Sequence, residues 1–161
     1  MSYNLPLICA LVGIAGVLFS IITASVVKKA PSGNEKMNEI ANAIKTGAIA
    51  YLNRQLKSMG IAAIILFILI AVFLNIKTAI GFICGATASF IAGYIGMRVS
   101  VIANVRTAEA ARGGLKQGLA MAFKGGAVTG MIVAGLALTA VAGFYTILIA
   151  TGTPVREAVI A

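Results

Sequence analysis

The sequence predicts an all-α, polytopic membrane protein with four transmembrane helices, and three observations carry that prediction. The 161-residue chain is 60% hydrophobic and only 11% charged, and its mean hydropathy of +1.03 lies well above that of soluble globular domains. Its charged residues leave four stretches that are each long enough for the roughly 20 apolar residues that cross a bilayer. Because strict two-residue alternation is absent, these stretches are predicted to be helices and not barrel strands.

The four predicted helices follow one another with short breaks. We expect them near residues 5–27, 58–75, 79–111 and 119–150. Only a few residues around Asn75 separate the second helix from the third, so these two form an antiparallel hairpin. The third continues past Arg98 into the cytoplasm until Gly113 and Gly114 break it. The fourth ends at a natural stop formed by residues 151–154.

A fifth, amphipathic helix is predicted at residues 33–57, between the first two spans. Ser32 and Glu35 have the spacing of a capping box, and Pro31 ends the preceding run. Apolar residues then recur at three- and four-residue steps, namely Met37, Ile40, Ala41, Ile44, Ala48, Tyr51 and Leu52. The Asn-rich polar face favours packing against cytoplasmic extensions of other helices, and a position at the lipid interface is the alternative.

The positive charges are distributed unevenly and predict the orientation of the chain. Six Lys and Arg residues lie between the first two spans and five lie at or between the last two, whereas only Lys77 and Arg156 lie on the other side. The positive-inside rule therefore places both long, mostly helical loops in the cytoplasm and both termini outside. Basic membrane loops account for the net charge of +9, so we expect an integral protein of the cell membrane with no nucleic-acid partner.

Small residues on the third and fourth spans predict a close helix contact. The third carries Gly81, Gly85, Ser89 and Gly93 at four-residue steps, and the fourth carries the shorter strip Gly126, Gly130 and Ala134. Such strips let two helices approach closely, so we expect these two strips to pack against each other. Cys9 and Cys84 fall inside spans, where each is expected to act as a small packing residue. The bulky second span suits a position facing lipid.

The reactive side chains are few. The chain has no His and no Asp, and its four Glu residues are Glu35, Glu39, Glu109 and Glu157. All four lie outside the segments predicted to cross the membrane, since Glu109 is in the cytoplasmic part of the third helix. A proton relay needs an ionisable group within the bilayer, and Mg²⁺ bound to phosphates is normally held by carboxylates. We therefore assign no catalytic, cofactor-binding or metal-binding residue. Glu109 has Arg106 and Arg112 one turn to either side, which predicts surface ion pairs.

Several segments nevertheless resemble one family in wording and order. GNEKM at residues 33–37 and AYLNRQ at 50–55 are similar to the first cytoplasmic loop of the membrane-integral pyrophosphatases. AGYIGM at 92–97 and ANVRTAEAAR at 103–112 resemble the end of that family's third helix, and AFKGGAVTG at 122–130 resembles the start of its fourth. The chain is thus identified as similar to the N-terminal part of such a pump.

The resemblance implies a homodimeric pump that hydrolyses diphosphate with Mg²⁺ and moves H⁺, or Na⁺ in some members, across the membrane. It implies an inner ring of helices that holds the substrate and the ion path, and an outer ring that contains the first four helices. The family's Asp-rich motifs have no counterpart here, so this chain is expected to bind no Mg²⁺ and to be inactive alone. The pumped ion and a dependence on K⁺ stay open.

Two other functions are consistent with a small, Gly- and Ala-rich membrane chain. A proteolipid ring subunit of a rotary ATPase would need a carboxylate in mid-membrane, and the sequence places none there. A small non-catalytic structural or assembly subunit needs no chemistry of its own. The resemblance favours the scaffold part of a pyrophosphate-energised pump over both.

Overall fold

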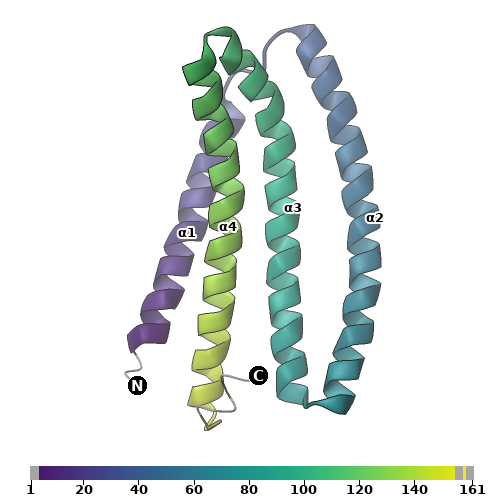
Figure 1. Ribbon diagram of the computed structural model, residues 1–161, viewed down its shortest axis with the longest axis vertical. Coiled ribbons are helices and arrows are strands. Elements are labelled where there is room, and N and C mark those ends of the chain that lie inside the picture. The colour runs from purple at the N-terminus through teal and green to yellow at the C-terminus, as the bar shows by residue number, and fades with distance from the viewer. Residues whose placement is uncertain (1–3, 155–157, 159–161) are drawn as a thin grey trace.

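The computed structural model describes residues 4–154 and residue 158, and this part of the chain forms four helices (Figure 1). They are α1 (Asn4–Lys29), α2 (Glu35–Phe73), α3 (Ile76–Arg112) and α4 (Leu115–Ala150). Each contains a segment long and apolar enough to cross a membrane. The predicted all-α class with four spans is therefore confirmed. Arg156 and Glu157, which the sequence analysis placed beyond the fourth span, lie outside the described residues.

The helices do not lie in chain order across the molecule. In Figure 1 they are arranged as α1, α4, α3 and α2, with α4 packed along both α1 and α3 and with α2 packed on α3. The α1–α2 loop and the α3–α4 turn lie at one end, which we call the loop end, and both termini lie at the other. Both predicted cytoplasmic loops thus share one end, and its orientation in the membrane stays a prediction.

Helix α2 joins the predicted amphipathic segment and the second span without a break. Its 39 residues make it about 58 Å long at 1.5 Å per residue. Its N-cap is Asn34, whose side chain accepts a hydrogen bond from the Met37 backbone N–H at 2.9 Å. The prediction that Ser32 caps this helix was wrong, because Asn34 directly precedes the first helical residue and is an equally good cap. Leu52 is buried, whereas Ile40 and Ile44 remain exposed.

The two tight turns have simple local causes. Asn75 caps α3 by accepting a hydrogen bond from the Thr78 backbone N–H at 2.8 Å, and this cap fixes the predicted α2–α3 hairpin. At the other end, Gly113 and Gly114 separate α3 from α4 as predicted. Gly114 has φ +132°, a conformation that a residue with a Cβ rarely adopts.

Helix α4 meets α1 at glycines, where the two backbones touch. A Cβ added to Gly135 would lie 2.6 Å from the carbonyl oxygen of Gly13, and one added to Gly16 would lie 3.5 Å from that of Met131. Nearer the loop end, the buried Ser20 hydroxyl donates to the carbonyl oxygen of Val128 at 2.6 Å. Because the hydrophobic effect does not drive helix association in lipid, α1 and α4 are held together by close packing and by this hydrogen bond.

Helix α4 meets α3 in the same way. A Cβ at Gly96 would lie 2.8 Å from Thr129 Cγ2, one at Gly125 would lie 2.8 Å from Ala103 Cβ, and one at Gly118 would lie 2.9 Å from an α3 side chain. Small residues facing one another thus hold these helices together over the half nearest the loop end.

The predicted contact between the two small-residue strips was wrong. A Cβ at Gly85 or Gly93 of α3, or at Gly126 or Gly130 of α4, would meet open space. A four-residue repeat drifts around a helix of 3.6 residues per turn, whereas a repeat of seven residues stays on nearly one side. The buried residues of α4 follow the second pattern, namely Gly118, Gly125, Val128, Ile132, Gly135, Ala142 and Leu148, of which all but the last fit two seven-residue series.

We expect the two classes of glycine to respond oppositely to an added methyl group. Gly135→Ala should destabilise the bundle by about 1–3 kcal/mol, because the Cβ would press on the α1 backbone. Gly130→Ala, in open space on the same helix, should be neutral or stabilise by up to about 1 kcal/mol. Unfolding in sodium dodecyl sulfate, followed by far-UV circular dichroism, measures both. Equal effects would contradict this packing.

Candidate functional site

At the loop end, the guanidinium of Arg106 donates two hydrogen bonds to backbone carbonyl groups. Its Nη2 donates to the carbonyl oxygen of Lys28 at 2.9 Å, and its Nη1 donates to the carbonyl oxygen of Ile102 at 3.0 Å. Lys28 lies in the last turn of α1, where carbonyl groups lack helical partners and the helix dipole is negative. Arg106 of α3 therefore holds the end of α1, 78 residues away along the chain.

The predicted pairing of Glu109 with two arginines is thus half correct. Glu109 Oε2 lies 3.1 Å from Arg112 Nη1, while Arg106 turns instead to the end of α1. The exposed helix-end carbonyl offers Arg106 a fixed acceptor, and Glu109 already has Arg112 within the same turn. No sequence pattern indicates this choice, since Lys28 contributes a backbone atom.

The α1–α2 loop passes directly over Glu109. Gly33 has φ +81°, and a Cβ there would lie 2.8 Å from Glu109 Oε2. Asn38 Nδ2 donates to the carbonyl oxygens of Gly33 and Asn34 at 3.2 and 2.9 Å and so fixes the loop to the start of α2. Gly33 thus brings the loop against Glu109 of α3, while Arg106 joins the end of α1 to the same helix.

The described residues contain no cluster of side chains that could bind a metal ion. Within residues 4–154, no three His, Cys, Asp or Glu side chains come together as metal ligands. Glu39 forms an exposed ion pair with Lys36 at 2.8 Å, and Cys9 and Cys84 are free thiols in spanning segments. The contacts described above pack the helices and join their ends.

Two grooves run along α4 on its two sides. One has a volume of about 230 Å³ and lies between α3 and α4, with Ser100, Asn104, Thr107 and Thr129 among its lining residues. The other has a volume of about 330 Å³ and lies between α1 and α3 over α4, and its lining is apolar except for Ser20, Ser25 and Lys28. The glycine-rich start of α4 borders the first groove as helix surface, and it forms no loop that could enclose a phosphate.

Comparison with known proteins assigns these helices to a family. Residues 14–160 match the family described as Inorganic H+ pyrophosphatase. The chain belongs to this family. The match begins inside α1 and includes all of α2, α3 and α4.

Named relatives include pumps for two different ions. The chain is 46% identical over 137 residues to the K(+)-insensitive pyrophosphate-energized proton pump of Methanosarcina mazei, and this alignment covers 84% of the chain and 20% of the relative. It is 41% identical over 126 residues to the K(+)-stimulated pyrophosphate-energized sodium pump of Thermotoga maritima, which covers 77% of the chain and 17% of the relative. The chain thus spans about a fifth of the length of these relatives, and it is an integral membrane protein like them.

The contact of Arg106 with α1 should be detectable by mutation. Arg106→Gln removes a charged hydrogen bond at a helix end, so we expect a loss of about 1–2 kcal/mol in stability and faster amide exchange in residues 28–34. Arg112→Gln is the matched control, because its ion pair is exposed and contributes under about 1 kcal/mol. Hydrogen exchange with mass spectrometry measures the loop directly, and equal exchange in both variants would contradict the role of Arg106.

Proposed function

We propose that this chain is an outer-ring scaffold of a pyrophosphate-energised ion pump, and that hydrolysis and ion movement take place on helices outside these 161 residues. The observation that carries the proposal is the combination of the family match over residues 14–160 with spans that contain no carboxylate and no His. Such spans can position neighbours, but they have no group to relay an ion.

The packing within the bundle supports a scaffold. Helix α4 contacts the backbone of α1 and small side chains of α3 at its glycines, and Arg106 joins α3 to the end of α1. Other surfaces remain open, including the polar groove between α3 and α4 and the strips of small residues beside it. Open small-residue surfaces of this kind suit contact with further membrane helices.

The proposal extends to the partners of the complete pump. It would take diphosphate as substrate together with Mg²⁺ and assemble as a homodimer, with Mg²⁺ held by carboxylates that this chain lacks. The relatives' names include K(+)-insensitive proton pumps and K(+)-stimulated sodium pumps. Both ions, and both behaviours toward K⁺, are therefore consistent with this proposal.

The alternatives have less support. A proteolipid ring subunit would require a carboxylate in mid-membrane, and all four Glu residues lie elsewhere in the sequence. An independent non-catalytic subunit would be expected to fold and remain monodisperse when expressed alone. A scaffold part of a larger pump should instead aggregate or be degraded, so size-exclusion chromatography of the chain in detergent separates these two functions.

The first prediction from this proposal concerns catalysis. The purified 161-residue chain, reconstituted in vesicles with Mg²⁺ and diphosphate, should release no phosphate above the rate of protein-free vesicles. The reason is that the described residues contain no carboxylate cluster to hold the metal-substrate complex. A phosphate-release assay with a full-length relative as positive control measures it, and Mg²⁺-dependent hydrolysis by the chain would overturn the proposal.

A second prediction concerns orientation. Both loops carry most of the positive charge, so the loop end should face the cytoplasm. In a variant with Cys9 and Cys84 replaced by Ala, a cysteine introduced by Lys116→Cys should react with a membrane-impermeant maleimide only after the cells are opened. A cysteine introduced by Thr151→Cys, at the opposite end, should react in intact cells, and the reverse pattern would disprove this orientation.

A further inference from the structure

The apolar groove between α1 and α3 is about as long as one lipid leaflet is thick. Its lining residues on α1 run from Val17 to Lys28, and those on α3 run from Ile91 to Ile102. Eleven residues of helix correspond to about 16 Å, and half of the hydrocarbon core of a bilayer measures about 15 Å. The groove therefore extends from near the middle of the membrane to its surface at the loop end.

The apolar lining of the groove favours hydrocarbon as its occupant. A single hydrocarbon chain could enter, with Val128 and Ile132 of α4 as the buried floor.

The serine hydroxyl groups that line the groove already donate hydrogen bonds within the protein. Ser20 donates its hydroxyl proton to the carbonyl oxygen of Val128 at 2.6 Å, and Ser25 donates to that of Ile21 at 3.0 Å. Both hydroxyl donors are satisfied inside the protein, so the wall of the groove is effectively apolar. Hydrocarbon that fills it gains dispersion contacts that an empty groove would forfeit.

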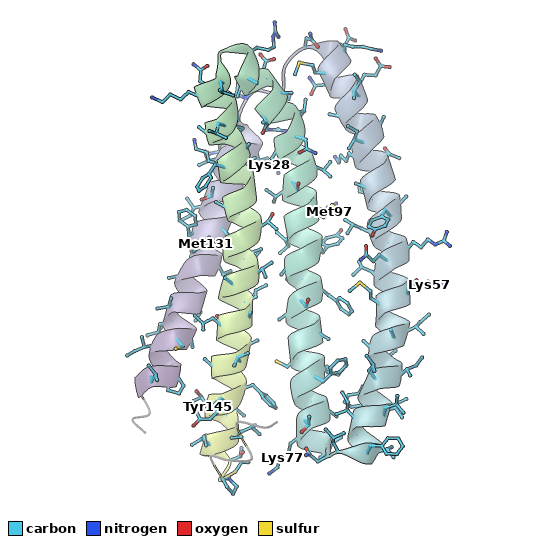
Figure 2. The ribbon with its side chains drawn as sticks, viewed as in Figure 1. Lys28, Lys57, Lys77, Met97, Met131 and Tyr145 are labelled. Atoms are coloured by element: carbon cyan, nitrogen blue, oxygen red, sulfur yellow. The ribbon has the colours of Figure 1, made fainter. Side chains whose placement is uncertain are left out.

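The charge at one end of the groove decides the chemistry of the head group. Lys28 lines the groove at its loop end and has no carboxylate within ion-pair distance among the described residues. The guanidinium of Arg106 lies against the Lys28 backbone at the same end. Figure 2 shows Lys28 toward the loop end of the bundle, with Lys77 at the opposite end. Basic positions between helices at a membrane surface attract anionic head groups.

We propose that this groove is a binding site for an anionic phospholipid, with one acyl chain along α1 and α3 and with the phosphate beside Lys28. Bound lipid would complete the packing of α1 against α3, two helices that meet mainly through α4.

The test uses photo-crosslinking of the complete pump that contains this chain, in vesicles of phosphatidylcholine with a minor fraction of phosphatidylglycerol, where either lipid carries a diazirine in its acyl chain. Mass spectrometry maps the crosslinks. We expect the ratio of phosphatidylglycerol to phosphatidylcholine crosslinks to be higher on residues 17–28 and 91–102 than on residues 61–73, the exposed apolar part of α2 that serves as the internal reference. An equal ratio would overturn the proposal, and so would the absence of crosslinks in the groove, as when a helix covers it.

Two pairs of variants separate the head group from the acyl chain. Lys28→Gln should lower the phosphatidylglycerol preference about fivefold, the factor expected for one lysine near an anionic surface, while Lys29→Gln, whose residue does not line the groove, should leave it unchanged. Ala24→Phe, which fills the groove, should reduce crosslinking by both lipids, and Ala62→Phe on the exposed face of α2 should not. Equal effects of the two lysine variants would overturn the head-group assignment even if Ala24→Phe failed to fold.

Discussion

The close packing of α4 between α1 and α3 is the constraint on which the rest of the structure depends. In lipid the apolar side chains of a helix gain nothing by leaving the solvent, so helices associate through close contact and hydrogen bonds. The backbones of Gly13 and Gly135 are in contact, and neighbouring side chains approach Gly96 and Gly125 about as closely. Most buried residues of α4 recur at seven-residue intervals, the spacing that keeps nearly one side of a helix toward its neighbours.

Different interactions hold the middle of the bundle and its loop end together. Between the loops and the opposite surface, the helices meet through small apolar residues that carry no charge. At the loop end, where carbonyl groups and charges meet water, Arg106 and Asn34 provide directional hydrogen bonds. Helix α2 takes part least, since none of its most apolar window is buried within the described bundle. It forms the margin of the structure, and its bulky surface is the part best suited to lipid.

Sequence alone predicted the elements well and their contacts less well. Charge spacing defined the four spans and both turns, because the bilayer demands a fixed length of apolar helix whatever the neighbours are. Packing through glycines was also predicted, but on the strip that includes Gly93, because only a four-residue repeat was considered. A search for seven-residue repeats would have found Gly118, Gly125 and Ile132. The role of Arg106 had no such signal, because its partner is the backbone of Lys28.

The place of α4 in the chain has a consequence for the order of membrane assembly. Helices α1, α2 and α3 are synthesised before α4, yet α1 makes most of its contacts with α4 and few with α3. Until α4 enters the bilayer, α1 is held beside the α2–α3 hairpin mainly by the loop that joins it to α2, by the hydrogen bond from Arg106 and by a few contacts with α3. Insertion of α4 closes the group in one step, so the fourth helix acts as the commitment point in the biogenesis of the whole unit.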